Sequence, residues 1–270
     1  MILCRHKYQY YYQNNMTLHK SKRYHKKYVL KHIIRILHYN ISEVLIMKKI
    51  YTCMPLKEKH KKLLESSSSN CEFIHLEQIK PSLEQVKDAN VIIGNIPVDI
   101  LKNIPNLEFV QLNSAGTNGY SDNPDFPKNV LLANATGAYG VAISECILAG
   151  ILTLMKHIPS YIKNQSDHDW KDEGSVESIY NSNILVLGLG DIGKEFSKRA
   201  YAMGAHITGI KRNIKDKPDY IDKLCTMDSL YDELEKADII VSSLPGSKST
   251  YRLLDEEALA HVKNNQFSSM

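Results

Sequence analysis

The sequence predicts an α/β protein with parallel sheets, built from two successive units. Short apolar runs alternate with segments of helical periodicity from Met47 onwards, and loop signals such as Ser66–Asn70 and Pro81 separate them. A glycine-rich turn near residue 188 also joins an apolar run directly to a helical segment. Alternation of this kind places helices on both faces of a parallel sheet.

The first predicted unit covers residues 47–145 and is flavodoxin-like. Its expected strands are Ile50–Met54, Cys71–Leu76, Val91–Gly94, Phe109–Leu112 and Val130–Ala133. Its expected helices are Leu56–Ser66, Ser82–Lys87 and Val98–Leu101. The apolar stretch Ala142–Met155, interrupted by Ser144 and Glu145, predicts a buried helix that leads out of this unit.

The second predicted unit covers residues 146–270. Its expected strands are Ile184–Leu187, His206–Ile210, a weakly indicated third strand, and Ile239–Leu244; its expected helices are Ile192–Met203, Leu230–Lys236 and Asp255–Val262. This is the order of a mononucleotide-binding half of a Rossmann fold. Because only four of the six Rossmann strands are present, we expect an incomplete domain. Its apolar edge at Ile239–Leu244 would promote aggregation unless a partner covers it.

Residues 1–46 differ in composition from the rest of the chain. They hold nine Lys or Arg and one acid, Glu43, which gives +8 against −4 for the remainder. A helix is possible from Tyr28 to Ile46. The bias toward Asn, Lys, Ile and Tyr favours translated sequence upstream of a natural start at Met47; a targeting peptide and a nucleic-acid-binding arm are the alternatives. The mildly acidic remainder argues against nucleic acid as a main partner.

The cysteines and the hydropathy predict a cytoplasmic protein without a membrane partner. Five cysteines lack paired spacing, which favours neither a zinc site nor disulfides and fits a reducing compartment. They are Cys4, Cys53, Cys71, Cys146 and Cys225. No apolar run approaches the roughly 20 residues that a membrane span needs.

The segment from Gly188 to Gly193 predicts a dinucleotide site. It has the pattern G-x-G-x-x-G and lies between a strand and a helix, where this pattern carries meaning. Gly188 permits a tight turn, Gly190 lets a diphosphate approach the backbone, and Gly193 lets the helix pack closely. Together with Asp191 and Ile192, which supply N–H groups at the helix start, these glycines are the expected diphosphate contacts.

The end of the second strand favours NADP over NAD. An NAD site usually has an acid there, on the ribose 2′-hydroxyl, whereas this chain has Lys211 and Arg212. Both cations could pair with a 2′-phosphate, and Arg212 could also stack on adenine. The alternatives are that Lys211 and Arg212 only cap a solvated strand end, or that the loop folds back so that Asp216 reaches the ribose of NAD.

Four segments together resemble the D-isomer-specific 2-hydroxyacid dehydrogenases. They are Leu107–Gly116, Asn134–Glu145, the glycine turn, and the strand ending in Leu244-Pro245. The resemblance covers roughly Met47 to Asn265. It implies a substrate domain over residues 47–145, a coenzyme domain over 146–270, and hydride transfer between NAD(P)H and a 2-oxo or 2-hydroxy acid. It also implies a homodimer.

The resemblance assigns roles to particular residues. The backbone N–H groups of Ser114, Ala115 and Gly116 would hold the substrate carboxylate. Leu244, Pro245 and Thr250 would line the nicotinamide ribose. Glu145 would be structural or lie on the coenzyme side. Trp170 matches the crossing segment before the glycine turn, and we expect it to be packed in the core.

No catalytic residue can be assigned. The resemblance implies a substrate-binding Arg and a His–Glu pair for proton transfer, all of which follow the matched region in the family. We therefore expect a C-terminally truncated member. His157, His168, His261 and Arg252 are candidates by residue type only. The alternatives are a dinucleotide binder without activity and a basic interaction module driven by residues 1–46.

Overall fold

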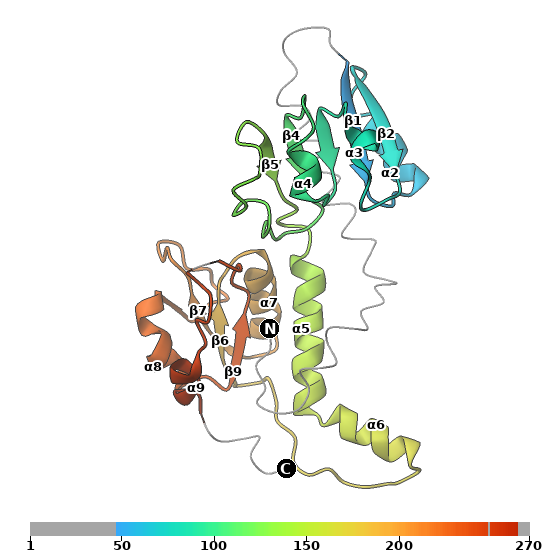
Figure 1. Ribbon diagram of the computed structural model, residues 1–270. Helices are drawn as coiled ribbons and strands as arrows, with labels where there is room; N and C mark the ends of the chain where they lie inside the picture. Colours follow the sequence, from blue (N-terminus) through green and yellow to red (C-terminus); the bar gives the residue numbers. More distant parts are fainter. Residues whose placement is uncertain (1–46, 248, 264–270) are drawn as a thin grey trace. The chain divides into compact units, whose positions relative to one another are not determined.

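The computed structural model describes residues 47–247 and 249–263 (Figure 1). Two compact units meet in the chain between Tyr139 and Gly140, and each is described below by itself. We call residues 47–139 the N-terminal unit and the described residues from 140 onwards the C-terminal unit. The possible helix at Tyr28–Ile46 and the interpretations of residues 1–46 lie outside the described residues. The substrate and coenzyme roles predicted for the two domains stay predictions.

The N-terminal unit is built on a five-stranded parallel sheet with the order β2-β1-β3-β4-β5. The strands are β1 (Lys48–Cys53), β2 (Cys71–Leu76), β3 (Val91–Ile93), β4 (Phe109–Gln111) and β5 (Leu131–Ala133). The helices are α2 (Glu58–Glu65), α3 (Leu83–Val86) and α4 (Val98–Leu101). Every element predicted here is confirmed to within two residues at each end.

Alternation along the strands divides the core of the N-terminal unit into two layers. On β1, Tyr51 belongs to a buried cluster with Val86 of α3 and Leu101 of α4. The neighbouring residue Ile50 belongs to a second buried cluster with Leu64 of α2. Helices therefore cover both faces of the sheet, and the loops after the strands gather at the carboxyl edge, where ligands bind in folds of this type.

The C-terminal unit is built on a four-stranded parallel sheet with the order β8-β7-β6-β9. The strands are β6 (Asn183–Leu187), β7 (His206–Ile210), β8 (Lys223–Cys225) and β9 (Ile239–Ser242). The helices are α5 (Gly140–Met155), α6 (Ile158–Ser166), α7 (Asp191–Ala202), α8 (Leu230–Leu234) and α9 (Glu256–Ala260), with a 3-10 turn at Met227–Ser229. This strand order is that of the first four Rossmann strands, so the predicted α/β fold is confirmed.

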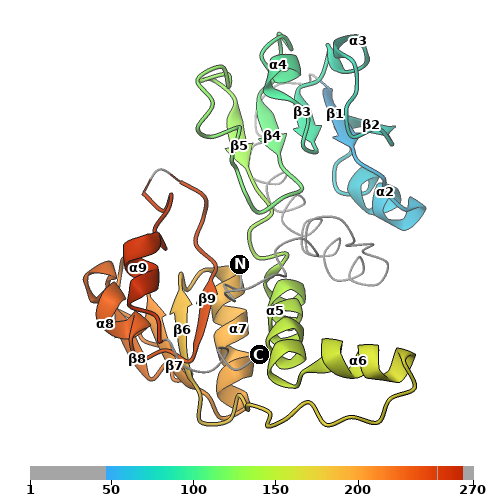
Figure 2. The ribbon, with the colours of Figure 1, turned by 60° about the horizontal axis from the view of Figure 1, so that its bottom comes forward.

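Helices cover both faces of this second sheet as well (Figure 2). Leu148 of α5 and Phe196 of α7 pack with Val186 of β6 on one face. Leu234 of α8 and Ala258 of α9 pack with Leu185 on the other. Among the described residues, β9 lies at the edge of the sheet, as expected.

One predicted residue environment was wrong. Trp170 was expected in the core, yet its side chain is fully exposed, at 103% of its reference area. It lies in a segment that leaves the compact body after α6, a helix that we did not predict. Among the described helices, none alone is long and apolar enough to cross a bilayer, and the pair α5 and α6 is bent by 65°.

Candidate functional site

The glycine turn between β6 and α7 depends on three backbone positions without side chains. Gly188 has φ +88°, a conformation that other residues rarely adopt. A Cβ at Gly193 would lie 2.0 Å from the carbonyl oxygen of Gly188, so only glycine lets α7 start this close to β6. A Cβ at Gly190 would meet nothing within 4 Å, and the space beside it is open to a ligand.

The start of α7 presents backbone donors beside this open space. The N–H of Lys194 closes the first helical hydrogen bond, to the carbonyl of Gly190 at 3.0 Å. Within the part of the chain that the structure describes, the N–H groups of Asp191, Ile192 and Gly193 have no acceptor. Together with the helix dipole, such free donors attract an anion.

Ser243 braces the turn from the end of β9. Its backbone N–H donates to the carbonyl of Leu187 at 2.9 Å, and its hydroxyl donates to the carbonyl of Gly188 at 2.6 Å. This residue was not among the predicted site residues, because a serine two positions before a proline carries no signal of such a contact. Its two bonds fix the carbonyls of Leu187 and Gly188 to the end of β9.

The carboxylate of Asp191 is hydrogen-bonded to the start of α5. It accepts a hydrogen bond from the N–H of Gly140 at 2.8 Å, where α5 begins. A Cβ at Gly140 would lie 2.5 Å from a carboxylate oxygen of Asp191, so this hydrogen bond requires glycine at position 140. The backbone N–H of Asp191 remains available to a ligand, and its side chain ties the glycine turn to α5.

Two cations follow β7, as the sequence predicted. The backbone of Lys211 is fixed by a 3.1 Å hydrogen bond from its N–H to the carbonyl of Cys225. The side chain of Lys211 is half-buried, and that of Arg212 is exposed. Neither cation forms an ion pair with a carboxylate in the described residues, so both charges are available to a ligand. Asp216 is also exposed, in the segment that follows.

The segment after β9 completes this edge of the sheet. The side chain of Leu244 lies against Gly188, 3.1 Å from the position of a Cβ there. The hydroxyl of Thr250 donates to the carbonyl of Pro245 at 2.5 Å and accepts from the N–H of Ser247 at 3.0 Å. Thr250 therefore closes the loop that carries Leu244 and Pro245.

In the N-terminal unit, the loop after β4 holds Ser114, Ala115 and Gly116. The carbonyl of Ser114 accepts from the N–H of Ala135 at 2.9 Å, and the carbonyl of Ala115 accepts from the side-chain amide of Asn134 at 2.7 Å. The carbonyl of Gly116 accepts from the hydroxyl of Ser114 at 2.8 Å. In contrast, the N–H groups of these three residues have no acceptor among the described residues. The loop therefore offers donors and no free carbonyl.

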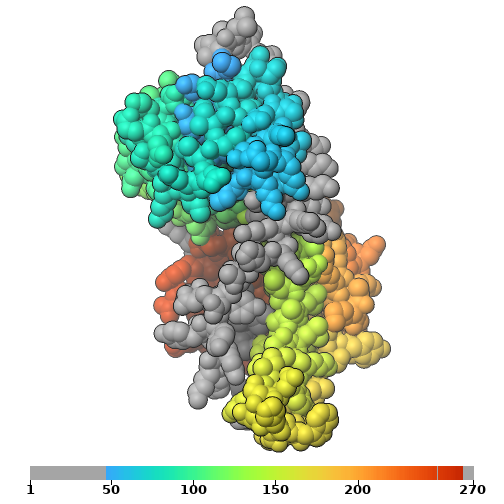
Figure 3. Space-filling model, turned by 90° about the vertical axis from the view of Figure 1, so that its right-hand side faces the viewer, coloured from blue at the N-terminus to red at the C-terminus, as the bar shows by residue number. Residues whose placement is uncertain are grey.

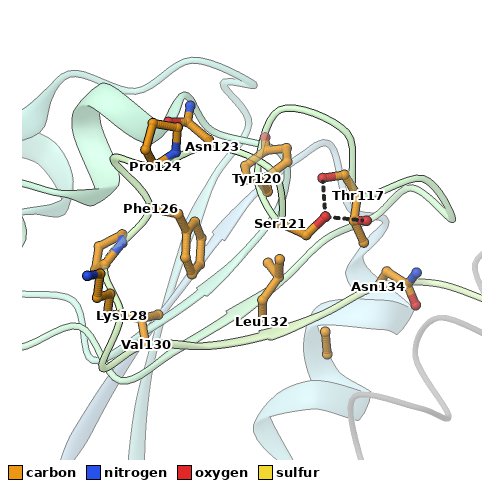
Figure 4. Close-up of a pocket in the computed structure, with 12 residues that line it drawn as sticks. Thr117, Tyr120, Ser121, Asn123, Pro124, Phe126, Lys128, Val130, Leu132 and Asn134 are labelled. Carbon is orange, nitrogen blue, oxygen red and sulfur yellow. Dashed lines mark hydrogen bonds between the residues drawn. The ribbon is translucent and has the colours of Figure 1, made fainter. Parts of the chain in front are cut away.

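A hollow of about 690 Å³ lies beside this loop, in the same unit (Figure 4). Tyr120, Phe126 and Leu132 contribute apolar surface to it, and Thr117 and Asn134 contribute polar groups. The hydroxyls of Thr117 and Ser121 are hydrogen-bonded to each other at 2.9 Å. Burial raises the pKa of Tyr120, and the phenol donates to the carbonyl of Ile96 at 3.0 Å.

Residues 148–267 match the family described as D-isomer specific 2-hydroxyacid dehydrogenase, NAD binding domain. This part of the chain belongs to the D-isomer-specific 2-hydroxyacid dehydrogenase family. Most of the C-terminal unit is accordingly similar to an NAD-binding domain. This finding agrees with the glycine turn and the strand order described above.

Curated relatives of this family match most of the chain at low identity. The D-3-phosphoglycerate dehydrogenase of Methanocaldococcus jannaschii is 24% identical over 81% of this chain and 43% of its own length. A putative 2-hydroxyacid dehydrogenase of Haemophilus influenzae is 22% identical over 69% of this chain and 61% of its own length. The chain thus spans less than two thirds of either relative.

Solved structures of family members share the fold. A D-isomer specific 2-hydroxyacid dehydrogenase family protein from Aeromonas salmonicida superposes with a TM-score of 0.71 at 20% identity, over 80% of this chain and 70% of that one. The D-lactate dehydrogenase of Aquifex aeolicus, complexed with NAD and lactic acid, gives 0.65 at 18% identity, over 81% and 67%. A Xanthobacter autotrophicus member in complex with NADPH gives 0.64 at 18%, over 80% and 69%.

Three histidines were candidate catalytic residues by residue type only. His157 faces the carbonyl of Glu173 at 2.9 Å, and His168 is exposed. His261 stacks on Tyr231 at 4.6 Å and pairs with Glu235 at 2.7 Å on the surface of α8 and α9. No cluster of metal-ligating side chains occurs in the described ranges.

Proposed function

We propose that this chain binds NADPH or NADH in its C-terminal unit and a 2-oxo or 2-hydroxy acid in its N-terminal unit, as an oxidoreductase of the D-2-hydroxyacid dehydrogenase type. The observation that carries the proposal is the side-chain-free turn at 188–193, whose open face adjoins three unpaired N–H groups. A diphosphate fits such donors in both charge and geometry.

Each part of the coenzyme has a chemical counterpart in this unit. The N–H groups of Asp191, Ile192 and Gly193 would hold the diphosphate. Lys211 and Arg212 would hold a 2′-phosphate, which favours NADP over NAD. Leu244, Pro245 and Thr250 would lie along the nicotinamide ribose. When bound, the coenzyme supplies the hydride chemistry, and the protein supplies position and electrostatics.

The substrate carboxylate would bind to the loop at Ser114–Gly116. The three N–H groups of this loop are unpaired in the described part of the chain, while the loop carbonyls are all taken by other donors. A carboxylate therefore meets donors without repulsion from carbonyl oxygens. One solved family member is complexed with NAD and lactic acid and another with NADPH, which supports these ligand classes.

Binding and turnover are tested separately. We expect NADPH fluorescence to change on titration with the folded chain, with tighter binding than NADH. Absorbance at 340 nm with glyoxylate, hydroxypyruvate or pyruvate then reports hydride transfer. Binding with turnover supports the oxidoreductase, and binding without turnover supports a non-catalytic dinucleotide binder. A folded chain that binds neither coenzyme would contradict both.

We also propose that a second copy of the chain covers an arm at residues 156–177. The arm is closed at its base, where the N–H of Glu177 donates to the carbonyl of Met155 at 3.2 Å. It exposes Ile162 at 58%, Trp170 at 103% and Val176 at 49% of their reference areas. Figure 3 shows α6 in yellow at the surface beyond the end of α5. Several exposed apolar side chains on one arm are typical of an interface, and homodimers are the commonest closed assembly.

A charge in this arm is expected to separate the copies. Ile162→Lys places an ammonium in the apolar surface and should shift the chain from dimer to monomer in sedimentation velocity. Ile214→Lys is the matched control, because Ile214 is exposed at 49% elsewhere in the unit. A dimer that survives Ile162→Lys would argue against the arm as the interface.

A further inference from the structure

One neighbouring segment, residues 134–139, orients three successive carbonyls at the loop Ser114–Gly116. The phenol of Tyr139 donates to the carbonyl of Asn113, the N–H of Ala135 to that of Ser114, and the side chain of Asn134 to that of Ala115. Three successive carbonyls thus turn toward the same segment. Burial raises the pKa of Tyr139, which keeps its hydroxyl protonated as a donor.

This arrangement fixes the direction of the free N–H groups. In a trans peptide, the carbonyl of one residue and the N–H of the next point in opposite directions. The bond to the carbonyl of Ala115 therefore turns the N–H of Gly116 away from Asn134. The bonds to Asn113 and Ser114 do the same for the N–H groups of Ser114 and Ala115, so all three face the side opposite residues 134–139.

A second amide side chain, that of Asn95, holds the loop from the segment that follows β3. The Oδ1 of Asn95 accepts from the N–H of Asn113 at 2.9 Å, and its Nδ2 donates to the hydroxyl of Ser114 at 2.9 Å. That hydroxyl donates in turn to the carbonyl of Gly116. The hydroxyl is thereby held as an internal link of the loop, and the N–H of Asn113 is removed from the set of free donors.

We infer that Asn134 and Asn95 are positioning residues for the substrate carboxylate. They do not contact the carboxylate; they hold the loop so that the N–H groups of Ser114, Ala115 and Gly116 face it together. This inference rests on the proposed function, because it needs a carboxylate ligand at this loop. Asn134 is the more direct of the two, since its amide alone fixes the peptide between Ala115 and Gly116.

The test removes the donor from Asn134 without changing its size. Asn134→Leu cannot donate to Ala115, and Asn134→Asp presents a carboxylate oxygen to that carbonyl. Asn118→Leu and Asn118→Asp are matched controls, because Asn118 is exposed in the same loop and its side chain has no hydrogen bond to another described residue. Glyoxylate is the probe, and amide NMR of the full chain with the oxidised coenzyme NADP+ present, which cannot reduce it, reports its binding.

In the unaltered chain, glyoxylate should shift the amide resonances of Ser114, Ala115 and Gly116. Both Asn134 variants should bind glyoxylate about tenfold more weakly, with smaller shifts at Ala115 and Gly116, while NADPH affinity stays unchanged. Asn118→Leu and Asn118→Asp should change glyoxylate affinity less than about twofold.

Two results would overturn the inference, and they can be told apart. Equal glyoxylate affinity in the unaltered chain and both Asn134 variants would exclude Asn134 as a positioning residue and leave the carboxylate site standing. The absence of glyoxylate-induced shifts at 114–116 in the unaltered chain would exclude the carboxylate site itself, and the positioning role with it.

Discussion

Gly193→Ala is expected to destabilise the C-terminal unit by about 3 kcal/mol and to abolish coenzyme binding. The added Cβ would lie 2.0 Å from the carbonyl oxygen of Gly188 and 2.8 Å from the hydroxyl of Ser243. The first of these contacts is with backbone, which cannot swing aside as a side chain would. Either α7 moves away from β6 or the turn at Gly188 changes conformation. Thermal unfolding followed by circular dichroism measures the loss of stability.

Gly190→Ala separates an effect on coenzyme binding from an effect on stability. Its Cβ would meet no atom within 4 Å, and the φ of Gly190 is −76°, which alanine adopts freely. We therefore expect unchanged thermal stability but about 10- to 100-fold weaker NADPH binding, because the methyl group would occupy the space of the diphosphate. Unchanged NADPH affinity in Gly190→Ala would place the diphosphate elsewhere, and an unaltered melting temperature in Gly193→Ala would contradict the packing argument.

The sequence predicted the strands and most helices because their burial follows a regular period. On β1 and β6, apolar residues alternate between two covered faces or run without interruption, which is the pattern of a parallel sheet. The glycine turn was equally visible, since Gly188 and Gly193 answer local steric demands and Gly190 leaves open the space beside the start of the helix. These features need no knowledge of distant parts of the chain.

Features that depend on distant contacts were missed or, like the third strand of the second unit, only weakly indicated. β8 has only three residues, of which Lys223 is exposed, so its composition indicates a strand only weakly. Its pairing with β7 defines it as a strand. Ser243 binds a carbonyl 55 residues away, and Asn134 binds one 19 residues away. Neither serine nor asparagine differs in sequence from an ordinary loop residue, because the partner is defined only by the fold.

The error at Trp170 has a different cause. A tryptophan usually contributes more to burial than any other residue, and on that basis we expected it in the core. The structure instead places it on an arm whose polar residues bond to one another, as Asn164 does to Glu173 at 2.8 Å. The arm satisfies its own polar groups and leaves its apolar side chains outward. Hydropathy cannot distinguish such a surface from a core.

The second large effect is expected on coenzyme preference, when Arg212 is replaced by Asp. Arg212 is exposed, follows β7, and forms no ion pair with a carboxylate in the ranges that the structure describes. A guanidinium that pairs with a 2′-phosphate in two hydrogen bonds contributes about 1.5–3 kcal/mol. Arg212→Asp removes this contact, adds repulsion toward a phosphate, and offers an acceptor to a ribose 2′-hydroxyl. We therefore expect the ratio of NADPH to NADH affinity to fall about 100-fold.

Lys215→Asp separates a specific contact from a general change of charge, because Lys215 is exposed only three residues further along. It makes the same change of net charge and should lower NADPH affinity by less than about threefold, an effect that 0.5 M salt should remove. The loss caused by Arg212→Asp should largely remain at that salt concentration, since a hydrogen-bonded pair is screened less than a distant charge. If the two variants lose NADPH affinity equally, the cations after β7 attract the coenzyme only by non-specific electrostatics and make no specific contact with the 2′-phosphate. If the unaltered chain prefers NADH, the acid that binds the ribose must be sought in the segment that holds Asp216, whose carboxylate would then have to reach the 2′-hydroxyl.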